Sequence, residues 1–136
     1  MRVAFATQDL HRVDAHFASA RNFILFDVQE DCHTLVEAVQ FDAVSDENGV
    51  HADEGEDRLG AKIAALAGVS LLFVLAIGGP AAARVVRARV HPVKLSQPEP
   101  IVQVIGRVQQ MMKGTPPPWL RKLMTNAKPD FTAEED

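Results

Sequence analysis

Residues 69–86 read VSLLFVLAIGGPAAARVV, and they give the clearest indication of the fold class. Its first part, Val69–Ile77, is uncharged and apolar on both faces, which is typical of a strand buried inside a sheet. A Gly-Gly-Pro sequence ends this strand, and Pro80 is suited to the first turn of a following helix. Arg89–Leu95 then predicts a further strand, and its proline places it at an edge of the sheet. The order strand, helix, strand indicates parallel pairing within an α/β fold.

The chain before this stretch predicts three more strands and one helix. Arg2–Ala6 is short and apolar, as expected of a first buried strand. Asn22–Val28 and Thr34–Phe41 flank a polar turn and predict a hairpin. Residues 42–56 are acidic and predict a solvated loop, and Asp57–Ala67 has the apolar spacing of a short helix.

The chain after it predicts a helix over Ile101–Met112 and a last short helix over Trp119–Ala127. The whole pattern predicts a single-domain α/β protein with a five-stranded mixed sheet flanked by helices, in a ribonuclease-H-like arrangement. We assign residues 1–112 to this domain. Residues 113–136 form a proline-rich C-terminal extension that we expect to be partly disordered.

Composition excludes several classes of protein. The 136 residues carry a net charge of −4, which argues against nucleic-acid binding. A single cysteine, Cys32, cannot form an internal disulfide or a four-cysteine metal cage, and we expect a cytoplasmic protein. Residues 63–83 lack charge, but glycines and a proline interrupt them, so we expect no membrane span.

Two segments carry the strongest candidate site. The long polar loop 7–20 follows the first strand and contains His16, a potential iron ligand with small neighbours on either side. The second segment is the glycine-led helix start, where backbone N–H groups can bind an anion. Its candidate residues are Gly78, Gly79, Ala81 and Arg84.

Other residues could also carry chemistry. Cys32 beside His33 could bind a metal or act as a nucleophile, although both residues can equally be incidental surface groups. His91 could be a second ligand or a structural histidine. A two-metal nuclease would need converging carboxylates. The candidates for these are Asp9, Asp14, Asp27 and Glu37.

Four segments of the chain together resemble a known family. They are residues 1–6 (MRVAFA), 13–23 (VDAHFASARNF), 77–86 (IGGPAAARVV) and 90–94 (VHPVK). They resemble the NifX family of dinitrogenase iron–molybdenum cofactor-binding domains, which includes NafY and the C-terminal part of NifB. The likeness covers about residues 1–112.

The resemblance implies a carrier without enzymatic activity. Such a protein transiently binds an iron–sulfur precursor of the iron–molybdenum cofactor and passes it between assembly proteins of the NifB and NifEN type. It also implies that His16 ligates the cluster, with Gly78, Gly79, Ala81 and Arg84 as further contacts. We expect a monomer. The alternatives are a protein–protein interaction or regulatory module that uses the acidic loop and the tail, and a metal-dependent nuclease.

Overall fold

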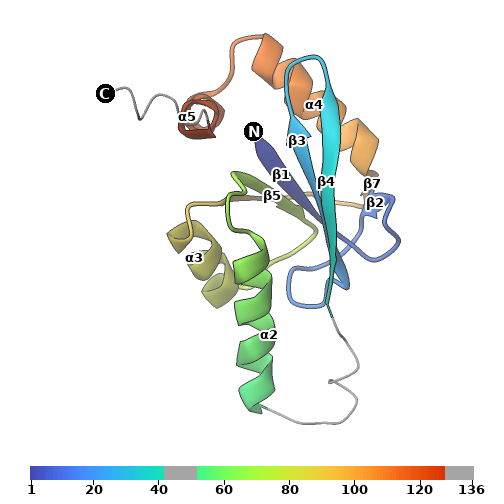
Figure 1. Cartoon of the computed structure of the whole chain (residues 1–136), viewed down its shortest axis with the longest axis vertical. Helices are drawn as coiled ribbons and strands as arrows, with labels where there is room; N and C mark the ends of the chain where they lie inside the picture. The colour runs from blue at the N-terminus through green and yellow to red at the C-terminus, as the bar shows by residue number, and fades with distance from the viewer. Residues whose placement is uncertain (42–51, 128–136) are drawn as a thin grey trace.

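The structure is a computed structural model, and it describes residues 1–41 and 52–127 (Figure 1). The strands are β1 (Arg2–Thr7), β2 (Arg12–Val13), β3 (Asn22–Val28), β4 (His33–Gln40), β5 (Leu71–Val74), β6 (His91–Lys94) and β7 (Glu99–Pro100). The helices are α2 (Ala52–Ala65), α3 (Gly79–Arg87), α4 (Ile101–Lys113) and α5 (Pro118–Ala127).

Five strands form one mixed sheet in the order β4-β3-β1-β5-β6, as predicted. The hairpin of β3 and β4 is antiparallel, and β3 pairs antiparallel with β1. Strands β1, β5 and β6 pair in parallel, because α3 returns the chain to the start of the sheet between β5 and β6. The edge position predicted for the proline-containing strand is confirmed by β6. Strands β2 and β7 form a separate two-stranded ladder.

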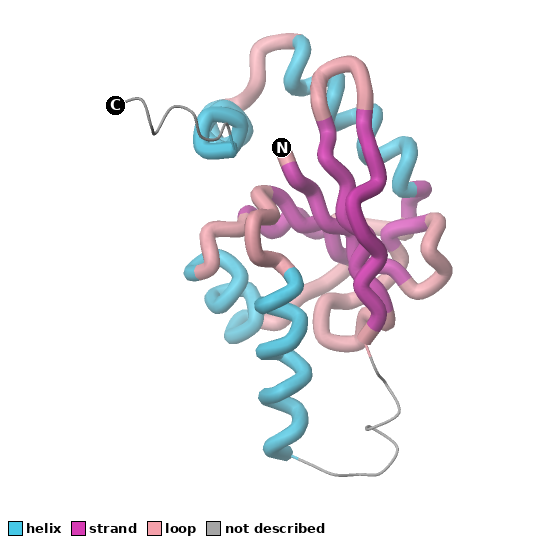
Figure 2. The backbone as a smooth tube through the Cα atoms, viewed as in Figure 1, coloured by secondary structure: helices cyan, strands magenta, loops and turns pink. Residues whose placement is uncertain are grey.

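Helices cover both faces of the sheet (Figure 2). One core lies between the sheet and the α2–α3 side, where Phe17, Phe23 and Leu66 are fully buried. The other core lies between the sheet and the α4–α5 side and includes Phe5 and Leu120. The alternation of β1 explains this division, since Ala4 and Ala6 belong to the first core while Val3 and Phe5 belong to the second.

Some predicted boundaries were wrong. Helix α2 begins at Ala52, so the predicted acidic loop 42–56 is helical from that residue on, and residues 42–51 lie outside the described ranges. An acidic composition does not exclude a helix here, because acidic residues are favoured near helix N-termini in general. Strand β5 spans only four residues rather than the predicted nine of 69–77.

The chain after residue 112 contributes to the domain core. Helix α5 inserts Leu120, which has no exposed surface, into the second core, and Trp119, Leu123 and Met124 pack around it. Residues 128–136 lie outside the described ranges. The uncharged stretch 63–83 is divided between α2, β5 and the start of α3. Within residues 1–41 and 52–127, no helix is long and apolar enough to span a bilayer.

Candidate functional site

The loop after β1 returns to the sheet beside the end of β5. The N–H of Leu75 donates to the carbonyl of Ala15 over 2.9 Å, and the N–H of Phe17 donates to the carbonyl of Ala76 over 2.8 Å. His16 therefore forms a parallel bridge with Ala76, only two residues before Gly78. The two predicted segments are brought together at the carboxyl ends of the parallel strands, where ligands bind in open α/β sheets.

The side chain of His16 points away from the core because the loop alternates like a strand. Ala15 and Phe17 are buried on one side, with 1% and 0% of their surface exposed, and His16 between them is exposed. Of the two small neighbours of His16, Ala15 is packed in the core and Ala18 is exposed.

The start of α3 is open. Gly78 is the N-cap and has an extended backbone (φ −71°, ψ 158°), no side chain caps the helix, and the first turn has no acidic residue. The N–H groups of Gly79 and Ala81 belong to the first turn, where the helix itself provides no acceptor. A Cβ added at Gly78 or Gly79 would meet no atom within 4 Å. These glycines are not required by a positive φ, and they leave the helix start uncovered.

Two basic side chains lie around this edge of the sheet. The Nζ atom of Lys62, on α2, donates to the carbonyl of Ala18 over 3.0 Å and lies 4.7 Å from the ring centre of Phe41. Arg84 extends from the second turn of α3 toward α2, and its Nη2 lies 4.0 Å from where a Cβ on Gly60 would stand. Arg84 therefore spans the gap between the two helices rather than folding over the helix start.

Lys62 was not among the site residues that we predicted from the sequence. Only 3% of its surface is exposed, and it fastens the loop that carries His16 to α2. A signal was available, because Lys62 lies three residues after Leu59 and four before Leu66, and so shares their apolar face. A lysine on such a face needs buried oxygen partners.

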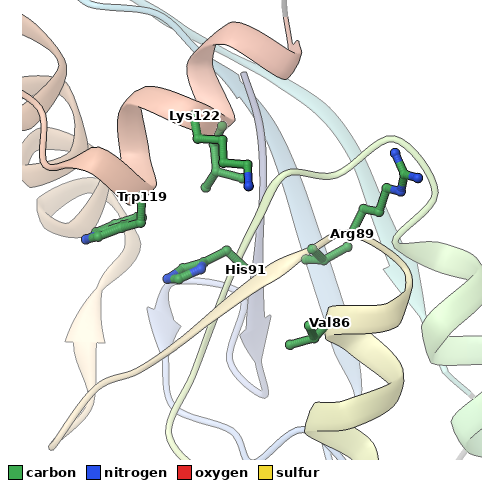
Figure 3. Close-up of a pocket in the computed structure, with 7 residues that line it drawn as sticks. Val86, Arg89, His91, Trp119 and Lys122 are labelled. Atoms are coloured by element: carbon green, nitrogen blue, oxygen red, sulfur yellow. The ribbon is translucent and has the colours of Figure 1, made fainter.

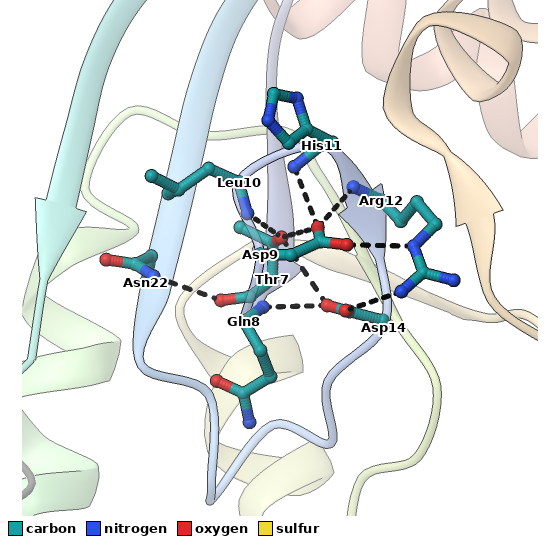
Figure 4. A network of polar contacts seen from close by, with 8 residues as sticks. All are labelled: Thr7, Gln8, Asp9, Leu10, His11, Arg12, Asp14 and Asn22. Atoms are coloured by element: carbon teal, nitrogen blue, oxygen red, sulfur yellow. Dashed lines mark hydrogen bonds and ion pairs between the residues drawn. The ribbon is translucent and has the colours of Figure 1, made fainter.

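The carboxylates of the loop hold the loop itself (Figure 4). Asp9 accepts the N–H groups of His11 and Arg12, each over 2.8 Å, and pairs with the Arg12 guanidinium over 2.8 Å. The backbone N–H of His11, followed by the Arg12 side chain, holds the pKa of Asp9 well below its usual range. Asp14 accepts the N–H of Gln8 over 2.7 Å. Both carboxylates are used as acceptors in a loop-closing network.

The carboxylates of the nuclease alternative do not converge. Asp27 pairs with Arg2 at the start of β1, the opposite end from the Asp9 loop, and the Arg2 guanidinium lowers the pKa of Asp27. Glu37 is exposed on the edge strand β4. In the described part of the chain, no group of three or more His, Cys, Asp or Glu side chains could hold a metal ion.

The other two candidate ligands lie far from His16. His91 pairs with Leu71 at the start of β5, whereas His16 pairs with Ala76, five residues further along. Five residues of strand correspond to about 16 Å. Cys32 lies in the turn between β3 and β4, next to the start of β1, and its thiol donates to Gln29. Neither residue can bind the same metal ion as His16.

The chain is similar to known proteins in sequence and in fold. Residues 1–111 match the family model described as dinitrogenase iron-molybdenum cofactor. The chain belongs to the dinitrogenase iron–molybdenum cofactor family. The resemblance that the sequence motifs indicated is thereby confirmed.

Two proteins named NifX are similar to this chain over most of their length. The chain is 54% identical to the protein NifX of Sinorhizobium fredii, over 93% of this chain and 79% of the relative. It is 53% identical to NifX of Rhodobacter capsulatus, over 98% of this chain and 84% of the relative. A crystal structure of PH0822 has the same fold, with a TM-score of 0.57 and 21% identity over 81% of this chain and 89% of that one. Family and relatives together support a role in nitrogen fixation, in the biosynthesis of the iron–molybdenum cofactor.

Proposed function

We propose that this protein is a carrier that binds an iron–sulfur precursor of the iron–molybdenum cofactor and passes it on within the cofactor assembly system. The observation that supports this proposal is the juxtaposition of exposed His16 with the uncapped, glycine-led start of α3. One metal ligand and one anion-binding helix end then lie at the same end of the parallel strands. An accessory role of this kind agrees with the family and its NifX relatives.

The imidazole of His16 would ligate one iron atom of the cargo, since neutral imidazole is a good ligand for iron. The N–H groups of Gly79 and Ala81 would donate hydrogen bonds to its sulfides, favoured by the partial positive charge of the helix start. Arg84 would add positive charge from the second turn, which favours an anionic cargo.

Weak holding follows from this ligand set. Cluster cages that are built of cysteine thiolates bind through four strong bonds. Here Cys32 lies at the opposite edge of the sheet, so the cargo would be held by one histidine and by hydrogen bonds. Such a cargo can leave when a partner offers thiolates. We propose that proteins of the NifB type supply the precursor and that proteins of the NifEN type receive it.

The substitution His16→Ala tests the proposal. The protein and its variant are incubated without oxygen with a purified iron–sulfur precursor, and the visible absorption and iron content are measured after gel filtration. We expect the affinity of the variant for the precursor to fall by more than about tenfold. Loss of a residue that only supports a metal ligand already weakens metal binding by about this much, and loss of the ligand itself should weaken it more.

The matched control is His11→Ala, which removes another exposed histidine of the same loop. The imidazole of His11 is not needed by the loop network, which uses only its backbone N–H. Unchanged uptake by His16→Ala would refute the ligand role. Capture of assembly proteins by the unsubstituted protein without any iron would instead favour the interaction-module alternative.

A further inference from the structure

A pocket lies at the opposite end of the parallel strands from His16. It is a pocket of about 460 Å³ between α5, the end of α3 and the start of β6 (Figure 3). Volumes of this size are typical of small-molecule sites. Three of the residues that line it come from α5, namely Trp119, Lys122 and Leu123. They lie beyond residue 111, where the match to the family model ends.

One wall of the pocket is planar and aromatic. The rings of His91 and Trp119 are stacked, with their centres 4.6 Å apart and 9° between their planes. Burial lowers the pKa of His91, so its imidazole is uncharged at neutral pH and forms an apolar surface with the indole. Val86, 58% exposed, and Leu123 add aliphatic surface. A planar ligand ring can pack against this stacked pair in the offset or edge-to-face geometry that aromatic rings prefer.

Two cationic side chains line the pocket, and no carboxylate of the described residues pairs with them. Lys122 projects from α5 into the space above β6, and Arg89 rises on the side of the pocket away from Trp119 (Figure 3). No acidic residue is among those that line the pocket. Within the described ranges, neither Arg89 nor Lys122 pairs with a carboxylate. The pocket is therefore positively charged at its rim and apolar on its wall.

The backbone of Arg89 supports a role for its side chain. The N–H of Arg89 donates to the carbonyl of Val86 and that of Val90 to the carbonyl of Val85, which is the Schellman pattern that ends a helix. The residue at this position takes a left-handed conformation, and Arg89 has a φ of 70°. Glycine is the residue that normally occurs there, because a Cβ is strained in this region. Helix termination alone does not explain why an arginine, rather than a glycine, takes this strained conformation at the pocket rim.

We propose that this pocket binds a planar aromatic anion of the nucleoside monophosphate class. The ring would pack against the stacked pair of His91 and Trp119, Lys122 would bind the phosphate, and Arg89 would join it after a change of side-chain rotamer, since its guanidinium points away from the pocket in Figure 3. The proposal does not depend on the cargo site, because the two sites lie at opposite ends of the parallel strands. Binding is therefore measured on the protein without any cluster.

Trp119 provides the assay. It is the only tryptophan in a chain without tyrosine, so intrinsic fluorescence reports on this pocket alone. The full chain is titrated with adenosine 5′-monophosphate, with adenosine and with inorganic phosphate, and the affinities are repeated by calorimetry. We expect saturable binding of the monophosphate, with adenosine and phosphate each bound at least about tenfold more weakly, since each lacks one of the two contacts. The affinity should fall as salt is added.

The substitution Arg89→Gly separates binding from stability. It removes the guanidinium and also the strain, so we expect at least about tenfold weaker binding of the monophosphate together with a Tm raised by about 3 °C. Lys122→Ala should weaken binding similarly. Arg87→Ala, an exposed arginine of α3 outside the pocket, is the matched control and should leave affinity unchanged. The proposal is overturned if the monophosphate does not bind, if adenosine binds equally well, or if both pocket variants retain full affinity.

Discussion

Replacing Leu120 by alanine tests whether α5 is an integral part of the folded domain. Leu120 is fully buried in the core that α4 and α5 share with the sheet. The change removes about three carbon groups, each worth about 0.8 kcal/mol of transfer free energy, and leaves a cavity that raises the total to about 3 kcal/mol. For a domain of this size, we expect the Tm to fall by about 9 °C.

The assay follows urea unfolding with two probes. Fluorescence reports on Trp119 in α5, next to the substituted residue, and circular dichroism reports on the helices as a whole. We expect the free energy from the fluorescence transition to fall by about 3 kcal/mol. Val102→Ala is the control, since Val102 is 63% exposed on α4 and its loss should change stability by less than about 0.5 kcal/mol. A loss below about 1 kcal/mol for Leu120→Ala would refute the docking of α5, and with it the pocket against β6.

Three further predictions concern the loop, the helix start and the pocket. Gly78→Val adds a side chain where no atom lies within 4 Å, in a backbone conformation that valine accepts. We expect the Tm to fall by no more than about 3 °C, because valine is a poorer N-cap than glycine, but at least about tenfold weaker cluster uptake, measured by iron content. Asp9→Asn should speed amide exchange at His11 and Arg12 and destabilise the loop by about 0.5–1 kcal/mol after allowance for solvent screening. Because the folded-state pKa of Asp9 is lowered, its contribution is present above about pH 4 and is lost on acidification, which the variant should not show. Burial lowers the pKa of His91, so the folded protein binds a proton at this imidazole less readily than the unfolded chain does. The free energy of unfolding should therefore fall as the pH drops below about 6.5. His91→Gln should remove that fall, as measured by urea titrations at several pH values.

The sheet could be predicted because its signals are local. Apolar runs flanked by turn residues located the five main strands, and the single strand–helix–strand unit around Pro80 gave the parallel pairing. Edge placement of β6 followed from Pro92, which cannot donate a ladder hydrogen bond. The predicted α4 differs from the observed helix by one residue.

Contacts between distant segments could not be predicted. The predicted strand extended too far beyond the end of β5. Leu75 and Ala76 leave the ladder with β1 and pair instead with the returning loop at Ala15 and Phe17. That exchange joins segments about sixty residues apart, and no local pattern encodes it. The small two-stranded ladder of β2 and β7 has the same origin.

The placement of the candidate ligands also depended on topology. Spacing alone left His16, Cys32 and His91 as possible members of one site. Parallel pairing of β1, β5 and β6 separates His91 at a strand start from His16 at the strand ends. The antiparallel pairing of β3 with β1 places the Cys32 turn beside the strand starts as well. The motif VHPVK thus contributes a strand start, whereas IGGPAA contributes the turn after a strand end.

The two edges differ in how their polar groups are held. At the His16 edge, backbone hydrogen bonds at Ala15 and Phe17 and the contact between Lys62 and Ala18 fix the loop, so the imidazole is held in place while its ring stays exposed. A site fixed by backbone can receive a cargo without first ordering a loop, which reduces the entropy lost on binding. At the opposite edge, Arg89 is held in a strained conformation beside a helix end. At each end of the parallel strands the backbone therefore fixes the residue on which the proposed binding depends, His16 at one end and Arg89 at the other, and the two proposed sites share no residue.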